Sequence, residues 1–292
     1  MEHNGKLRVR FNLFDALIIL LALGVLAAAV VLRNRSVEGG VTHETTTMRY
    51  TVEWTRTPHN MAECIHVGDD AFRATDGAYL GTVAEFRAVP HVELEYSAAQ
   101  GRYIRYESPD HDDIYITIEG QGYATVKDVT IGDIPVRVGM ELPLKGKGYA
   151  RIGYVVDMDT MDAVLPTTTD LGAGNLTADY VIRVEDARDF ISANIHEGDH
   201  LYEAVTGAQL GVVKSFSVQP YTETRLGADG VARTVEKDGR SLVLIRLEGR
   251  CVEKNDGYYL DGATELKVGA ATYFRSQYLE RQFTFFELTS LE

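Results

Sequence analysis

The chain has 292 residues, 45% of them hydrophobic, with a formal net charge of −14 and two cysteines. This length is enough for more than one domain with its own core. The negative charge disfavours nucleic acid as a partner, because phosphates would be repelled, and two cysteines do not make a disulfide scaffold.

Residues 11–32 form an almost unbroken apolar run near the N-terminus. As a helix rising about 1.5 Å per residue, the run would be roughly 33 Å long, enough to cross a hydrocarbon core of about 30 Å. A cleaved signal peptide is the alternative, because Ala27, Ala28 and Ala29 are small enough for a peptidase site. The run is longer than an ordinary signal-peptide core, so we expect an uncleaved transmembrane signal anchor at 11–32.

The short N-terminus at 1–10 is expected to be cytoplasmic, and the large remainder of the chain extracytoplasmic. The charge bias across the span is small, with three basic residues before it and two soon after it. Residues 1–32 carry a net charge of +1, from three basic and two acidic residues, which leaves −15 on residues 33–292.

The chain after the anchor repeats itself with an offset of 130 residues. Eleven of the 25 positions in residues 66–90 are identical to their counterparts in residues 196–220. At this spacing each copy is domain-sized rather than one unit of a solenoid. The resulting segments are a stalk at 33–48, repeat 1 at 49–157, a linker at 158–178 and repeat 2 at 179–289.

Both repeats are expected to be mainly β. Residues 114–118 and 242–247 are rich in β-branched and aromatic side chains, and Gly-Asp or Asp-Gly pairs recur at the short intervals typical of turns. Short helical turns are expected at 60–65 and 189–195. Many short strands with little helix predict one N-terminal transmembrane helix followed by two tandem homologous small β-barrel or β-sandwich domains.

Eight residues at matching positions of the repeats are assigned a structural role in turns. An aspartate that follows glycine commonly accepts hydrogen bonds from turn amides, and the glycines supply backbone freedom. The positions are Gly68, Asp69, Gly77 and Gly81 in repeat 1, and Gly198, Asp199, Gly207 and Gly211 in repeat 2.

A zinc-hydrolase site is a remote alternative, because His196, Glu197 and His200 satisfy the H-E-x-x-H pattern. That chemistry requires both histidines on one helical face, with the glutamate activating a metal-bound water. Here the pattern contains Gly198-Asp199, a turn signal, and the matching segment 66–70 lacks the glutamate and the second histidine. We therefore expect His66 and His196 to be hydrogen-bonded residues beside a turn, and we predict no catalytic, cofactor-binding or metal-binding residues.

Three other features leave alternatives open. Acidic residues at 110–113 and at Asp157, Asp159 and Asp162 are either solvated hairpin and linker acids or calcium ligands. Aromatic residues between 258 and 286 either fill the core of repeat 2 or form a contact surface for carbohydrate or protein. Cys64 and Cys251 occupy non-equivalent positions of the repeats and are either two free thiols or one disulfide.

A basic N-terminus, the Phe-Asn-Leu-Phe-Asp entry at 11–15 and the Gly-Asp, Thr-Gly and Leu-Gly-x-Val patterns carry a family resemblance. The chain resembles a bacterial single-pass membrane family catalogued as domain of unknown function 4330. The resemblance implies a location in the bacterial cytoplasmic membrane and an architecture, but no functional residues.

The expected function is that of a non-enzymatic, membrane-anchored extracytoplasmic scaffold or assembly component of the bacterial cell envelope. The expected partners are the membrane, through residues 11–32, and other envelope proteins, with no cofactor. The alternative from another class is an extracytoplasmic module that binds a ligand, either a glycan or a cation.

Overall fold

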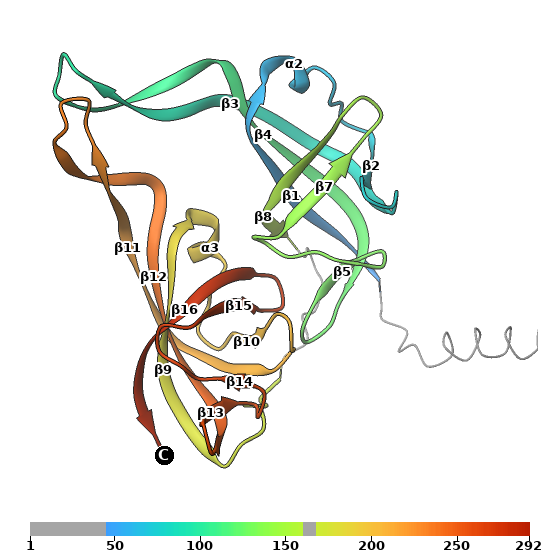
Figure 1. Ribbon diagram of the computed structural model, residues 1–292. Coiled ribbons are helices and arrows are strands. Elements are labelled where there is room, and N and C mark those ends of the chain that lie inside the picture. The colour runs from blue at the N-terminus through green and yellow to red at the C-terminus, as the bar shows by residue number, and fades with distance from the viewer. Residues whose placement is uncertain (1–44, 160–167) are drawn as a thin grey trace, which may run out of the picture. The chain divides into compact units, whose positions relative to one another are not determined.

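The computed structural model describes residues 45–159 and 168–292, which belong to one compact unit, Thr45–Glu292 (Figure 1). The predicted N-terminus at 1–10, the predicted anchor at 11–32 and most of the stalk lie outside the described residues. Within the two described ranges, no helix is both long and apolar enough to cross a membrane.

Repeat 1 is one antiparallel sheet with a short helix, α2 (His59–Ala62). Its strands are β1 (Thr46–Pro58), β2 (Asp70–Arg73), β3 (Tyr79–Ser97), β4 (Arg102–Ala124), β5 (Val129–Ile131), β6 (Ile134–Pro135), β7 (Glu141–Lys145) and β8 (Ala150–Asp159). The order in the sheet is β1-β8-β7-β2-β3-β4-β5-β6, and β1 also pairs with β4. This extra pairing closes six of the eight strands into a ring.

Repeat 2 follows the same plan, with the short helix α3 (Asp189–Ala193) after its first strand. Its strands are β9 (Leu176–Arg188), β10 (His200–Glu203), β11 (Gln209–Leu226), β12 (Ala232–Lys254), β13 (Gly257–Leu260), β14 (Thr264–Glu265), β15 (Ala271–Arg275) and β16 (Glu280–Leu291). The order is β11-β10-β15-β16-β9-β12-β13-β14, with β11 also paired to β12. Each strand of repeat 1 therefore has a counterpart in repeat 2 with the same neighbours.

The prediction of a mainly β chain with two antiparallel β domains is confirmed. The expectation of short strands is wrong for β3, β4, β11 and β12, which have 19, 23, 18 and 23 residues. Register shifts at Pro90/Val92 and Pro220/Thr222 interrupt these strands, and the pairing resumes beyond them. Turn residues mark where a strand is interrupted. They do not show that pairing resumes after the interruption, so the full length of these strands could not be predicted from them.

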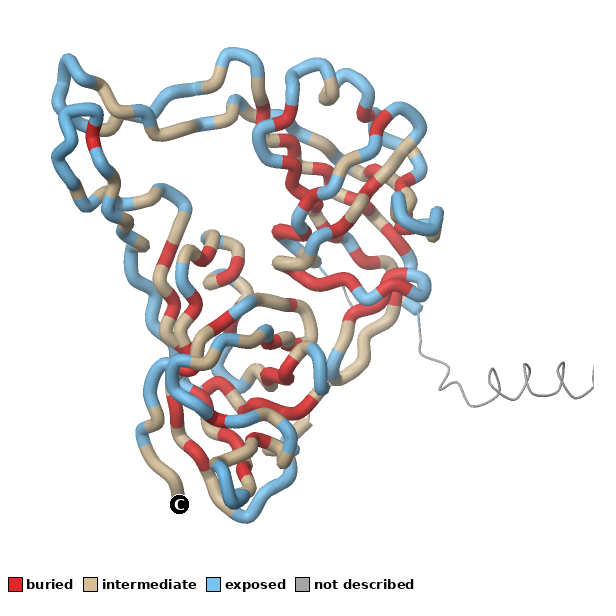
Figure 2. The backbone as a smooth tube through the Cα atoms, in the orientation of Figure 1, coloured by how far each residue is buried: buried red, intermediate tan, exposed pale blue. Residues whose placement is uncertain are grey.

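The core of each repeat comes from alternate residues of the long strands (Figure 2). The alternating buried apolar residues are Met48, Tyr50, Val52 and Trp54 in β1, and Ala178, Tyr180, Ile182 and Val184 in β9. Successive side chains of a strand point to opposite faces, so one face of each strand is buried. Burying these apolar side chains supplies the main favourable free energy of folding.

A glycine at the crossing of two strands lets the backbones approach closely in each repeat. Gly81 has φ +129°, and a Cβ at this residue would lie 2.2 Å from the Glu119 carbonyl oxygen. Gly211 has φ +148°, and a Cβ at this residue would lie 2.4 Å from the Glu248 carbonyl oxygen. These positions accept only glycine without a backbone shift.

Beyond the register shifts, the strand pairs continue as two-stranded hairpins, which we call arm 1 (92–107) and arm 2 (222–236). Figure 1 shows both arms extending past the rest of their sheets. The pairing of β1 with β4 ends at His111, so within its sheet arm 1 is paired only through its own two strands.

Candidate functional site

The candidate site lies between the repeats and begins at a kink shared by β1 and β9. Arg56 and Asp186, at matching positions, both have φ +48°. An arginine from the matching last strand supports each kink: Arg151 Nη2 donates to the Thr55 carbonyl oxygen at 3.1 Å, and Arg281 Nη2 donates to that of Asp186 at 3.5 Å. The two repeats therefore share this backbone feature.

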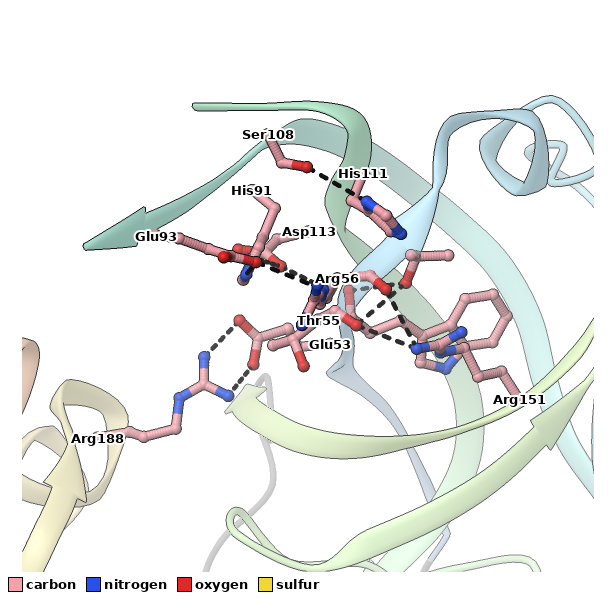
Figure 3. Close-up of polar contacts among 12 residues, drawn as sticks. Glu53, Thr55, Arg56, His91, Glu93, Ser108, His111, Asp113, Arg151 and Arg188 are labelled. Atoms are coloured by element: carbon pink, nitrogen blue, oxygen red, sulfur yellow. Dashed lines mark hydrogen bonds and ion pairs between the residues drawn. The ribbon is translucent and has the colours of Figure 1, made fainter. Parts of the chain in front are cut away.

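The charges around the kink are inverted between the repeats. In repeat 1 the amide of Arg56 donates to Asp113 Oδ1 at 2.9 Å, and Asp113 also contacts His91 Nδ1 at 2.8 Å (Figure 3). In repeat 2, Asp186 is the acidic residue, and Lys237 Nζ lies 3.0 Å from its carboxylate. A basic residue among acids in one repeat thus corresponds to an acidic residue among bases in the other.

A bidentate ion pair joins the repeats next to these kinks. The two terminal nitrogens of Arg188, the last residue of β9, contact the two carboxylate oxygens of Glu53 in β1 (Figure 3). Glu53 is only 1% exposed, and Arg188 is the oppositely charged partner that a buried carboxylate requires. Burial, together with the charge of Glu53 and a hydrogen bond to it, raises the pKa of Tyr115 to about 12. Tyr115 is therefore a neutral donor at physiological pH, and the Arg87 guanidinium lies 4.0 Å from its ring centroid.

A cavity of about 530 Å³ lies beside this ion pair. Its charged and aromatic lining comes from both repeats: Glu53, Glu85, Arg87, Tyr115 and Asp157 from repeat 1, and Arg188, Asp189 and Phe190 from repeat 2. A second cavity of about 630 Å³ shares Tyr115 and Gly239 with the first and extends between the arms. Acids outnumber bases in the first cavity, whereas Arg105, Arg225, Lys237 and Arg240 make the second more basic.

The two arms meet through polar side chains. Tyr96 donates to Asp229 Oδ2 at 3.2 Å, and Tyr103 donates to the Leu226 carbonyl oxygen at 3.3 Å. Arg105 Nε of arm 1 also donates to Asp238 Oδ2, just beyond arm 2, at 2.6 Å. Each of these bonds joins residues more than 120 positions apart in the sequence.

A third set of contacts joins the β6–β7 region to the turn between β15 and β16. Val138 and Leu279 form a parallel bridge, and both are fully buried. Arg137, 6% exposed, contacts Asp128 and places Nη1 3.2 Å from Glu280 Oε2. Burial lowers the pKa of Arg137, and the carboxylate of Glu280 counteracts this effect.

The structure places the H-E-x-x-H segment in a turn followed by a strand. Helix α3 ends at Ala193, and His200 is the first residue of β10. His196 Nδ1 lies 2.7 Å from the Tyr278 hydroxyl, whereas His200 Nδ1 lies 3.0 Å from Gln209 Nε2. The helical context that a zinc hydrolase requires is therefore not formed, and the two imidazoles have separate partners. Within residues 45–159 and 168–292, no three His, Cys, Asp or Glu side chains are grouped to hold a metal ion.

The eight turn positions lie at matching places of the two repeats. Each aspartate accepts a hydrogen bond from the histidine amide three residues before it: His66 N to Asp69 Oδ2 at 3.1 Å, and His196 N to Asp199 Oδ2 at 2.8 Å. The other positions, with their φ angles, are Gly68 (+93°), Gly77 (+76°), Gly81 (+129°), Gly198 (+91°), Gly207 (+71°) and Gly211 (+148°).

The remaining open alternatives have these outcomes. Residues 110–113 lie in β4, one strand of the β3–β4 hairpin, and Asp112, 8% exposed, contacts His59 Nδ1 at 2.5 Å. Asp162 lies outside the described residues. Cys64 is exposed and Cys251 is buried, and both are free thiols. Of the aromatic residues near the C-terminus, Phe274, Phe283 and Phe285 are in the core, whereas Tyr273 and Phe286 are exposed.

Sequence reasoning missed the Glu53–Arg188 pair and the contact between the arms. One signal was present: at the 130-residue offset, Glu53 aligns with Arg183 and Arg188 aligns with Pro58. Where matching positions of the two repeats differ in charge, the two repeats have different surfaces. The surface with which each repeat contacts the other is one such place.

Comparison with known proteins identifies a family. The family model described as "Domain of unknown function (DUF4330)" matches residues 1–159, which include the apolar run and repeat 1. No curated protein and no solved structure matches the chain. Because the matched segment is more than half of the 292 residues, the chain belongs to the DUF4330 family.

Proposed function

We propose that the protein is a non-enzymatic scaffold or assembly component of the bacterial cell envelope. Residues 11–32 would anchor it in the cytoplasmic membrane and hold two homologous small β-barrels on the extracytoplasmic side. The length and apolarity of that run support the anchor. The six-strand rings support barrels over sandwiches, because β1–β4 and β11–β12 pairing closes each sheet on itself.

The observation that carries the proposal is the pair of arms bonded to each other. An isolated two-stranded hairpin is marginally stable in water, so bonds between the arms make each one a better-defined surface. The arms also expose large apolar side chains: Val92 is 46% exposed, Tyr106 45%, Leu226 72% and Val231 52%. Exposed apolar side chains on ordered hairpins with free strand edges are typical of a protein-binding surface.

Site-specific photo-crosslinking in intact cells tests this proposal. A photoreactive amino acid replaces Leu226 in arm 2, and the same amino acid replaces Val67, which is 63% exposed outside both arms, as the control. We expect a discrete envelope protein to crosslink at position 226 and not at position 67. No adduct at position 226, with the full chain folded and in the membrane, would refute the scaffold proposal.

A ligand-binding module is the second candidate, because the cavities of about 530 and 630 Å³ between the repeats are in the size range of ligand sites. A ligand that binds only the folded protein raises its unfolding temperature. Screening glycans and cations for such a shift tests this candidate independently of the crosslinks.

A further inference from the structure

A separate cavity of about 510 Å³ lies between β7–β8 of repeat 1 and β15–β16 of repeat 2. It shares no lining residue with the cavities beside Glu53 and between the arms. Six of its lining residues carry its chemistry: Glu141, Tyr154, Tyr273, Glu280, Arg281 and Gln282.

The two walls of this cavity are built alike, although their residues do not occupy matching positions of the repeats. Glu141 pairs with Tyr154 across β7 and β8, and Tyr273 pairs with Gln282 across β15 and β16. Directly paired residues of antiparallel strands project to the same face of a sheet. Each wall therefore presents one phenol ring beside one side chain that carries an oxygen acceptor.

Both rings are accessible. Tyr154 is 39% exposed and Tyr273 is 48% exposed. The Tyr154 hydroxyl donates to Glu141 Oε1 at 2.8 Å, and this hydrogen bond raises its pKa, so the phenol stays neutral. The bond also holds the ring and the carboxylate in a fixed relation to each other.

Backbone hydrogen bonds next to the cavity fix the separation of its walls. The amide of Glu280 donates to the Val138 carbonyl oxygen at 2.9 Å, and the amide of Val138 donates to the Tyr278 carbonyl oxygen at 2.6 Å. Gly139 makes this approach possible, because a Cβ at this residue would lie 2.4 Å from the Glu280 carbonyl oxygen. A site whose walls are joined by backbone hydrogen bonds is pre-organised, which lowers the entropy lost on binding.

This arrangement matches the chemistry of a sugar ring. Aromatic faces pack against the C–H groups of a pyranose, while carboxylate, amide and guanidinium groups bond its hydroxyls. The Glu280 carboxylate is already paired with Arg137, and Arg281 offsets Glu141, so the cavity has little net charge. The −15 charge of residues 33–292 would repel an anionic glycan.

We propose that the cavity between β7–β8 and β15–β16 binds a neutral saccharide, held between Tyr154 and Tyr273. This inference gives the ligand-binding candidate a location and a ligand class. It is independent of the arms, so the crosslinking test of the scaffold and the binding test of this cavity can fail separately.

Calorimetric titration of the full chain, in a detergent without a sugar headgroup, tests the proposal. The probes are maltotetraose and the tetramer of N-acetylglucosamine as neutral glycans, with trigalacturonate as the anionic comparison. We expect saturable binding of at least one neutral probe and binding of trigalacturonate that is weaker by about tenfold or more.

Variants locate the binding. Tyr273→Ala and Tyr154→Ala should each weaken it by about tenfold, whereas Tyr273→Phe, which keeps the ring, should retain most of it. Tyr106→Ala is the matched control, because Tyr106 is 45% exposed but lies in arm 1. Circular dichroism verifies that each variant is folded. The proposal is overturned if neither neutral probe binds at about 10 mM, or if binding survives unchanged in folded Tyr273→Ala and Tyr154→Ala.

Discussion

The two repeats build the same ring of strands but fill it with side chains of different size. Trp54 of β1 packs where Gly153 of β8 leaves room, since a Cβ on Gly153 would lie 2.4 Å from Trp54 Cδ1. At the matching positions of repeat 2 the sizes are exchanged, with Val184 in β9 and Phe283 in β16. All four residues are buried, so each ring pairs a larger with a smaller side chain at these positions, in the opposite order.

Other paired features keep both residue type and role. Tyr50 donates to the Leu80 carbonyl oxygen at 3.1 Å, and Tyr180 donates to that of Leu210 at 2.7 Å. Buried hydroxyls need a partner, and here that partner is a backbone oxygen fixed by the strand crossing. The comparison teaches that positions bonded to backbone retain their residue, whereas packing positions and surfaces facing the other repeat can diverge.

Truncating the largest core side chain should produce the largest stability loss. Trp54→Ala removes a fully buried ring that packs edge-on against Tyr149 at a centroid distance of 5.7 Å, and we expect a cost of about 3–5 kcal/mol. Val184→Ala, at the matching position of repeat 2, should cost about 2 kcal/mol, because it removes only two methyl groups. Chemical denaturation of the full chain, followed by circular dichroism, measures both. Equal costs would contradict the exchange of sizes between the repeats.

Breaking the ion pair between the repeats should have the next largest effect. Arg188→Met leaves the carboxylate of Glu53 buried without its partner, and we expect a loss of about 3 kcal/mol at neutral pH. The fluorescence of Trp54, the one tryptophan of the chain, follows denaturation next to the site.

Adding Glu53→Gln to Arg188→Met should restore part of the loss, because the unpaired charge is removed. If the double variant is as unstable as the sum of the two single variants, Arg188 and Glu53 are not coupled, and the repeats are not joined at this site.

Substituting two glycines at matching positions distinguishes the cost of backbone strain from the cost of disturbing the contact between the repeats. Gly139 and Gly269 occupy matching positions with φ +90° and +88°, but a Cβ on Gly269 would have no atom within 4 Å. Gly269→Ala should therefore cost about 1 kcal/mol from φ strain alone, and Gly139→Ala about 2 kcal/mol, because its Cβ also meets the Glu280 backbone. Thermal unfolding of the full chain distinguishes the two, and equal costs would mean that the walls of the proposed saccharide cavity are not held at this distance.

Periodicity and turn residues predicted the β class and the approximate places of the short helices, found at His59–Ala62 and Asp189–Ala193. These features depend on neighbouring residues, so the local sequence carries the information. The contact of Glu53 with Arg188 joins residues 135 positions apart, and no local pattern selects such a partner. For the same reason the cavity between Tyr154 and Tyr273 could not be predicted, although the tyrosines near the C-terminus were considered as a carbohydrate-binding surface.

The smallest effect concerns one turn that the repeats stabilise with different chemistry. In repeat 1, Arg73 Nε donates to Asp76 at 3.0 Å, and the Ala78 amide also donates to this carboxylate. The two hydrogen bonds lower the pKa of Asp76 to about 2. At the matching positions of repeat 2, Glu203 accepts hydrogen bonds from Thr206, and it also accepts one from Thr272. Burial alone would raise the pKa of Glu203, but these hydrogen bonds lower it.

Because the folded pKa of Asp76 lies below its ordinary value, its stabilisation is present above about pH 4 and is lost as the pH falls towards 2. The stability difference between the native chain and Asp76→Asn should therefore shrink across this window, and the same sign is expected for Glu203→Gln. At pH 7, about 1 M salt should reduce the stability difference between the native chain and Asp76→Asn, because salt screens an exposed ion pair. The stability difference for Glu203→Gln should change less, because the donors to Glu203 are neutral. Urea denaturation as a function of pH and salt measures both, and a common response to salt would show that the two turns are held by the same kind of interaction.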